Sequence, residues 1–155
     1  MKGETKQIIE RSTSTLLKIS SEGDVEIVGE GYEAFICEKI IRAIGRGFNP
    51  YTALRLLHED CSLIVIDLKD FSGKSKNKLL RIKSRLIGKR GKARRVIERL
   101  TDCSLCVYGK TVALIGEFNE LDIAFRGVEK LILGSPHGNV YGYLEREMRK
   151  LKSSI

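Results

Sequence analysis

The stretch that decides the fold runs from residue 86 to residue 101 and reads LIGKRGKARRVIERLT. Two basic residues separate its two glycines, and its later apolar residues recur at the spacing of one helix face, at Ala93, Val96, Ile97 and Leu100. Apolar residues at i, i+3, i+4 and i+7 are typical of an amphipathic helix packed on a core. The stretch therefore predicts a basic, flexible loop at residues 88–91 that leads directly into a helix.

The positive charge of the chain is concentrated around this loop. The 155 residues carry 28 basic and 20 acidic groups, a formal net charge of +8. Residues 74–95 hold eleven of the basic groups and no acid, whereas the rest of the chain carries 17 basic against 20 acidic groups. Such runs are often a solvated face or a disordered tail. Because apolar residues at helical spacing interleave this one, we favour a folded surface that binds a polyanion, with a merely solvated face as the alternative.

The chain also repeats itself. At an offset of 88, residues 2–20 fall on residues 90–108 with six identities, at Gly3, Ile9, Glu10, Arg11, Thr13 and Leu17. With the offset shortened by one residue, VEIVGE at 25–30 falls on VALIGE at 112–117. Self-similarity at a fixed offset is the signature of a duplicated structural unit. The same unit therefore occurs twice, and the second copy is the more complete.

The order of elements follows from the second copy. β-branched runs predict strands, a short link containing glycine predicts a hairpin turn, and an asparagine before a periodic run predicts a helix N-cap. The expected elements are a strand at 61–68, a helix at 75–87, the loop, a helix at 92–101, two strands joined at Gly109 and Lys110, and a helix from an Asn119 N-cap to about Leu133.

This order, with G-x-x-G between its first two helices, resembles the type I KH domain, which binds single-stranded nucleic acid. Glycines let the backbone approach a phosphodiester, and the start of the following helix supplies a positive dipole end. KH loops clamp about four nucleotides of backbone beside an apolar groove for the bases. The expected RNA-binding residues are Ile87, Gly88, Lys89, Arg90, Gly91, Lys92, Arg94, Arg95 and Ile97. Glycines that serve only a helix–helix turn are the alternative.

The expected fold class is α+β, with two tandem type I KH domains. Residues 58–155 form a complete KH domain with a C-terminal helix, and residues 1–57 form a truncated, divergent KH-like domain with a linker helix. The first copy begins at the end of its own loop, so it lacks a first strand, a first helix and the first glycine. Either the natural start lies upstream, or residues 1–57 depend on packing against the second domain or a neighbouring molecule.

Further stretches extend the resemblance to nearly the whole chain: IGRGFNPYTALRLL (44–57), RLIGKRGKARRVIE (85–98), VYGKTVALIG (107–116) and LGSPHGNVYGYLE (133–145). They are similar to archaeal members of the Partner of NOB family, which are KH-domain assembly factors of the small ribosomal subunit. The resemblance implies binding of the 3′ end of pre-16S ribosomal RNA. It also implies a NOB-type endonuclease and a translation initiation factor subunit as partners. The alternatives are a KH-domain regulator that binds mRNA, an adaptor to RNA-degradation machinery, and a scaffold that contacts ribosomal RNA non-specifically.

Other chemistry has no basis in the sequence. Cys103 and Cys106 form a CxxC, but no second pair completes a metal site, so we expect free thiols in a reducing compartment. The GKRGKAR stretch lacks the spacing of a P-loop, and the two histidines, His58 and His137, have no nucleophile pattern near them. No apolar run approaches the roughly 18 residues of a membrane span. We expect a non-enzymatic, cytoplasmic protein without metal, cofactor or membrane contact.

Overall fold

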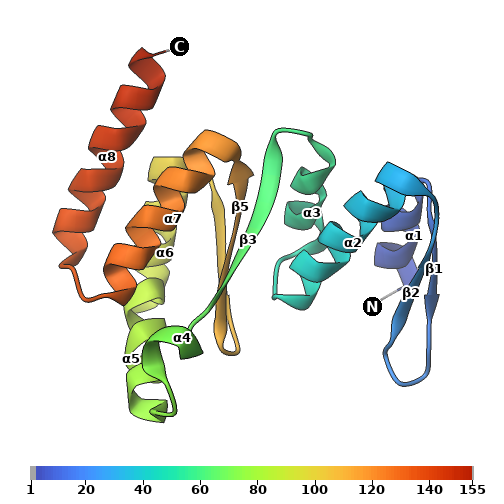
Figure 1. Ribbon diagram of the computed structural model, residues 1–155, viewed down its shortest axis with the longest axis horizontal. Coiled ribbons are helices and arrows are strands. Elements are labelled where there is room, and N and C mark those ends of the chain that lie inside the picture. The colour runs from blue at the N-terminus through green and yellow to red at the C-terminus, as the bar shows by residue number, and fades with distance from the viewer. Residues whose placement is uncertain (1–2, 155) are drawn as a thin grey trace. The chain divides into compact units, whose positions relative to one another are not determined.

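The computed structural model describes residues 3–154 and is of mixed α+β class (Figure 1). The chain divides into two compact units, Met1–Glu59 and Asp60–Ile155. Within the described part of the chain, no helix is both long enough and apolar enough to cross a bilayer.

The second unit contains the G-x-x-G loop. Its elements are β3 (Cys61–Asp67), α4 (Lys69–Ser72), α5 (Lys76–Ile87), a 3-10 turn (Lys89–Gly91), α6 (Lys92–Thr101), β4 (Ser104–Tyr108), β5 (Thr111–Glu117), α7 (Phe118–Ile132) and α8 (His137–Ser153). The three strands form an antiparallel sheet in the order β3-β5-β4. The two-residue turn between β4 and β5 has its glycine, Gly109, at φ +56°, where a residue with a side chain is disfavoured.

One hydrophobic core joins the helices of this unit to its sheet. Its fully buried side chains come from every layer and include Leu86, Ile97, Leu114, Val128 and Leu144. Gly127 lets α8 lie close to α7, because a Cβ atom at this glycine would stand 2.6 Å from Cδ2 of Leu144. Helix α8 is therefore part of the core of its own unit.

Two details differ from the sequence-based expectation. Helix α7 begins at Phe118 with Glu117 as its N-cap, so the predicted cap at Asn119 is wrong. The reason is tertiary: β5 runs straight into the helix, and the Phe118 N–H donates to the carbonyl oxygen of Asp60 at 3.1 Å. Helix α4 was not predicted, because its four residues are too few to show a helical period.

The first unit is smaller. It consists of α1 (Gly3–Thr13), β1 (Leu16–Ile19), β2 (Val25–Val28), α2 (Gly31–Gly45), α3 (Pro50–Ala53) and a 3-10 turn (Leu54–Leu57). Its sheet has two antiparallel strands, in which Leu16 lies opposite Val28 and Ile19 opposite Val25. Isolated two-stranded sheets are marginally stable. The buried side chains of α1 and α2, among them Ile9, Cys37 and Ile40, therefore supply most of the core of this unit.

The sequence repeat is also visible in the structure, because α1 of the first unit and α6 of the second unit end in the same way. At the end of α1 and of α6, a threonine hydroxyl donates to the carbonyl four residues earlier, at 2.7 Å from both Thr13 and Thr101. The next residue is left-handed in both units, with φ +54° at Ser14 and +56° at Asp102. Identical threonines, each followed by a left-handed residue, thus end both helices with the same local geometry.

A second pair of equivalent hydrogen bonds joins this helix to the strand that follows it. The Leu17 N–H donates to Oε2 of Glu10 at 2.8 Å, and the Leu105 N–H donates to Oε2 of Glu98 at 3.0 Å. Each glutamate therefore fixes the edge strand of its hairpin against the helix. The repeat is thus conformational as well as sequential from α1 through α2, and from α6 through α7.

We expect Leu144→Ala to lower the free energy of unfolding by about 2–5 kcal/mol, because it removes a fully buried side chain from the contact between α7 and α8. Leu133→Ala is the matched control: Leu133 is 70% exposed, so its truncation should change stability by no more than about 0.5 kcal/mol. Denaturant unfolding of the whole chain measures both values. Equal effects of the two substitutions would show that α8 does not belong to this core.

Candidate nucleic-acid interface

The loop between α5 and α6 has a backbone that only glycine fits at its first position. Gly88 ends α5 with φ +75°, and its N–H donates to the Ser84 carbonyl at 2.8 Å. A Cβ atom on Gly88 would lie 2.6 Å from the backbone nitrogen of Ala93 and 2.7 Å from its Cβ. Residue 88 therefore has no room for a side chain, because α6 begins directly against it.

The last two residues of the loop are left-handed. Arg90 has φ +56° and Gly91 has φ +76°, and the Gly91 N–H donates back to the Gly88 carbonyl at 3.2 Å. Gly91 is also the N-cap of the ten-residue helix α6, whose first turn contains no acid. The first N–H groups of a helix lack partners within it and carry a partial positive charge. The loop thus places exposed backbone and a helix N-terminus side by side.

The basic side chains near the loop fall into two groups. Lys89, Arg90 and Lys92 are exposed, and none of them belongs to an ion pair found among residues 3–154. Arg94, by contrast, pairs with Glu98 at 3.3 Å, and an Nη1 N–H of Arg95 donates to the Arg90 carbonyl. Arg95 therefore holds the loop conformation, while the first group is free to meet an anion. The RNA contact of all of them stays a prediction.

The two isoleucines that were predicted to line an apolar groove differ in burial. Ile87 is 37% exposed beside the loop, whereas Ile97 is completely buried and can support a groove only from beneath. Cys106 of β4 is half-buried near α6. Burial raises the pKa of its thiol, the charge of Arg94 opposes that shift and Glu98 reinforces it. Cys106 thus lies close enough to Arg94 and Glu98 of α6 to feel the charges of both.

One member of the basic run has a structural task instead. Arg85 donates from Nε to the Leu131 carbonyl at 3.0 Å, and from Nη2 to the Ser135 carbonyl. The carbonyl of Arg85 in turn lies 2.9 Å from Nε2 of His137, the first residue of α8. Arg85 and His137 therefore join the end of α5 to the turn between α7 and α8. The sequence alone did not distinguish Arg85 from its basic neighbours.

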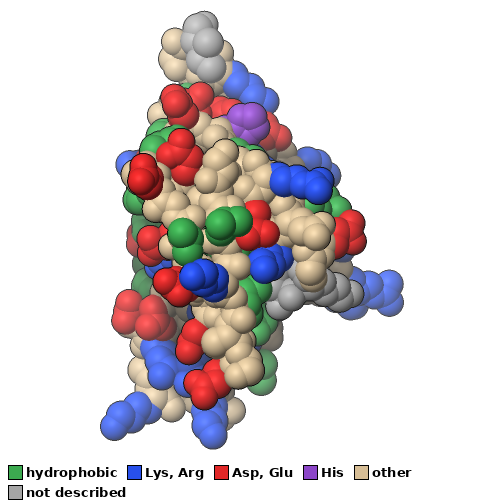
Figure 2. Space-filling model, turned by 90° about the vertical axis from the view of Figure 1, so that its right-hand side faces the viewer, with side chains coloured by type: hydrophobic (Ala, Val, Ile, Leu, Met, Phe, Trp, Pro, Cys, Tyr) green, Lys and Arg blue, Asp and Glu red, His purple; other side chains and the backbone are tan. Residues whose placement is uncertain are grey.

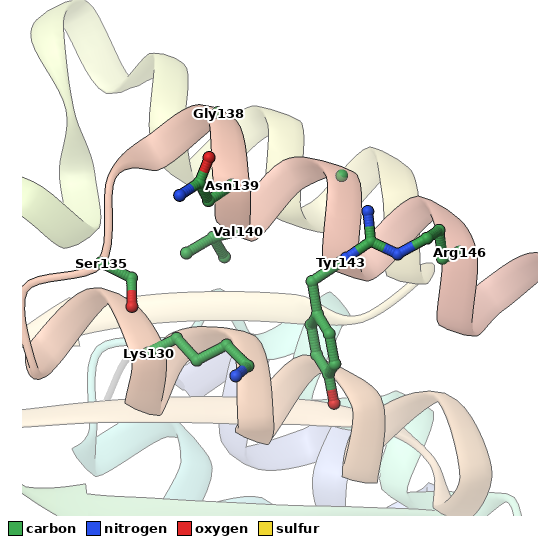
Figure 3. A pocket seen from close by; sticks show the side chains of 8 residues that line it. Lys130, Ser135, Gly138, Asn139, Val140, Tyr143 and Arg146 are labelled. Carbon is green, nitrogen blue, oxygen red and sulfur yellow. The ribbon is translucent and has the colours of Figure 1, made fainter.

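Two further basic hollows lie in the same unit. One, of 440 Å³, contains four lysines, Lys69, Lys74, Lys76 and Lys110. The other, of 460 Å³, lies along α7 and α8, where Lys130 and Arg146 face it and the Lys130 ammonium stands 4.8 Å from the centre of the Tyr143 ring (Figure 3). Part of the first hollow could be found from the sequence, because Lys74 and Lys76 open the basic run, but no pattern of residues indicated that Lys110 would join them.

The first unit lacks such a cluster. Residues 1–60 carry eight basic and ten acidic groups. On the face shown in Figure 2, acidic and basic side chains are interspersed with patches of apolar side chains. Mixed charges of this kind do not build a strong field for a polyanion.

No residues arranged for metal binding are present in the described range. Across residues 3–154, no three His, Cys, Asp or Glu side chains come together in a way that could hold a metal ion. Among the described residues no disulfide joins the four cysteines, of which Cys37, Cys61 and Cys103 are buried.

The second unit matches a family model. Residues 62–149 match the model of the second KH domain of PNO1, described as a eukaryotic type KH domain, KH-domain type I. This match confirms the predicted KH-type domain around the G-x-x-G loop. The model covers more than half of the chain.

Similar proteins extend the match. A KH domain-containing protein of Methanocaldococcus jannaschii is 43% identical over 97% of this chain and 68% of its own length. The pre-rRNA-processing protein pno1 of Aspergillus fumigatus is 32% identical over 74% of this chain, which spans only 46% of that relative. Dim2p of Pyrococcus horikoshii, solved as an a/eIF2alpha–aDim2p–rRNA complex, is 42% identical with a TM-score of 0.88, over 97% of this chain and 85% of that one. The chain therefore belongs to the PNO1/Dim2 family of KH-domain ribosome assembly factors.

Proposed function

We propose that this protein is a non-catalytic assembly factor that binds the 3′ end of pre-16S ribosomal RNA through the GKRG loop of its second unit. The observation that carries the proposal is the loop itself. Lys89 and Arg90 are exposed between two left-handed glycines at the start of a helix, inside a unit of KH type.

The loop has the physical properties that a phosphodiester backbone requires. A glycine backbone without Cβ atoms admits close approach of a phosphate, and the α6 N-terminus attracts its charge. The side chains of Lys89, Arg90 and Lys92 add three cations with no acid in the neighbouring sequence from residue 74 to residue 95. Sequence-specific reading of single-stranded RNA then falls to the groove between α6 and β4, where unstacked bases find apolar surface.

The identity of the RNA is supported by the relatives. The fungal relative is named a pre-rRNA-processing protein, and Dim2p of Pyrococcus horikoshii was solved with rRNA and a/eIF2alpha. We propose the same class of RNA for this chain, and the alpha subunit of the initiation factor as a protein partner. A NOB-type endonuclease as a second partner rests on the family resemblance alone.

We also propose that residues 1–57 are a divergent KH-like domain and residues 58–155 a complete one. The equivalent hydrogen bonds of Glu10 and Glu98, and the matching ends of α1 and α6, support this tandem organisation. Residues 1–57 contain no complete G-x-x-G and no excess of basic groups, so we propose that they orient the second domain and do not hold RNA by themselves.

We expect the double substitution Lys89→Asp and Arg90→Asp to abolish tight binding of a single-stranded RNA with the 16S 3′-end sequence. Aspartate tolerates the left-handed backbone at residue 90, so the fold is retained while two carboxylates face the phosphates. Losing two phosphate contacts should also flatten the log-log salt dependence by about 1.4. Fluorescence anisotropy over a series of salt concentrations measures both effects.

The control for that experiment is Arg11→Glu with Lys18→Glu, which makes the same change of net charge on exposed side chains of the first unit. Binding by the loop variant that is as tight as binding by this control would refute the site assignment. Equal binding of unrelated RNA sequences by the parent protein would instead favour a general RNA-binding regulator.

We expect residues 58–155 to bind single-stranded RNA without the first unit, because they contain the loop and the basic run. Residues 1–57 should show no binding at physiological salt. Circular dichroism establishes that each fragment is folded before its binding is measured. RNA binding by a folded 1–57 fragment would contradict the proposed division between the two domains.

A further inference from the structure

The four-lysine pocket lies away from the GKRG loop and has no role in the function proposed above. Its volume is 440 Å³, and it is lined by Lys69, Lys74, Lys76 and Lys110 together with Gly73 and Ser75. Helix α5 has twelve residues, which corresponds to a length of about 18 Å. The pocket lies at the beginning of this helix and the GKRG loop lies at its end. The two features are therefore at opposite ends of α5.

Three chain segments meet to form the pocket. Lys69 is the first residue of α4, Lys74 and Lys76 flank the start of α5, and Lys110 lies in the turn between β4 and β5. The Leu68 N–H donates to the Lys110 carbonyl at 2.8 Å and so fixes this turn against α4. Figure 1 shows α4 beside the end of the hairpin. The lysines are thus gathered by tertiary structure and not by sequence proximity alone.

Lys69 and Lys110 lie close enough for the charge of Lys69 to disfavour that of Lys110. A side-chain hydrogen bond with Lys69 and the charge of Lys69 lower the pKa of Lys110, with a smaller contribution from burial, while Asp67 opposes the shift. Asp67 is itself engaged, since its Oδ1 accepts the Lys69 N–H at 2.9 Å. Asp70 of α4 is the other acid nearby in the sequence, and no acid lines the pocket. An anion placed between like charges that are held close together offsets their repulsion, so such a cluster favours anion binding.

The start of α5 adds a further donor set to the same pocket. Ser75 is the N-cap, and its Oγ accepts the Lys78 N–H at 3.1 Å. The first turn contains no acid, so the N–H groups at the pocket face no competing carboxylate within their own helix. Gly73, at φ +58°, contributes a position without a side chain, and a Cβ there would meet nothing within 4 Å. The pocket is therefore open to a ligand.

We propose that this pocket binds a phosphate group of RNA, at a position separate from the GKRG loop. That the phosphate comes from RNA rests on the function proposed above. A strand clamped at the loop has a second anchoring point at the opposite end of α5, so the bound RNA extends beyond the roughly four nucleotides that a KH loop holds. The second point lengthens the footprint and fixes the direction in which the strand leaves the loop.

The test uses the whole chain and two single-stranded RNAs with the 16S 3′-end sequence, one of about four nucleotides and one of about twelve. The variant is Lys74→Gln with Lys110→Gln, both of which are exposed, so the fold should be unaffected. The matched control is Arg11→Gln with Lys18→Gln, which removes the same charge from the first unit. We expect the pocket variant to bind the short RNA as the control does, and to show a log-log salt slope for the long RNA that is flatter by about 1.4.

The outcomes separate this inference from the proposed function. If the pocket variant matches the control for both RNAs, while Lys89→Asp with Arg90→Asp weakens both, the loop binds RNA and the pocket does not. If the pocket variant weakens the short and the long RNA equally, the pocket is not a separate anchoring point. If the loop variant binds both RNAs like the parent, the proposed function fails whatever the pocket does. Amide chemical shifts of residues 73–76 that move only with the long RNA would support the inference independently.

Discussion

The contact between residue 88 and the start of α6 is the constraint on which the second unit depends. Because a Cβ at Gly88 would stand 2.6 Å from the Ala93 nitrogen, helix α6 can begin directly against the end of α5 only if residue 88 is glycine. That close turn leaves the loop short, exposed and left-handed, and the Arg95 side chain holds it by donating to the Arg90 carbonyl. The same geometry that makes the turn compact also makes it a surface that a phosphate can approach.

Electrostatics then follows from where the helices place their basic residues. Eleven basic groups without an acid repel one another, and a folded chain tolerates this only where the charges are solvated or an anion is bound. The basic residues of this run have different roles in the structure. Arg85 is used internally to fasten α5 to the α7–α8 turn, Lys89 and Arg90 face outward at the loop, and Lys74 and Lys76 join the distant Lys110. The basic run of residues 74–95 thus contributes side chains to three different places on the second unit.

The two units share some contacts of the repeat and differ in others. Glu10 and Glu98 make the same hydrogen bond, and Thr13 and Thr101 end their helices in the same way, because these contacts fix a helix against a strand. The basic loop is not repeated within the given sequence: residues 1–60 contain no complete G-x-x-G and carry eight basic against ten acidic groups. The hydrogen bonds that hold the helix against the strand thus occur in both units, whereas the basic loop occurs in the second unit.

Local periodicity and glycine placement in the sequence were enough to predict β3, α5, α6, the repeat and the position of the basic loop. The KH-type fold followed from the resemblance that this order of elements carries. The sequence by itself misplaced the start of α7 at Asn119, since the bond from Phe118 to Asp60 is a contact between distant residues. It could not show that Ile97 is wholly buried, that Arg85 is structural, or that Lys110 meets Lys69. Those outcomes depend on how separate segments pack in space, which no local pattern of residues records.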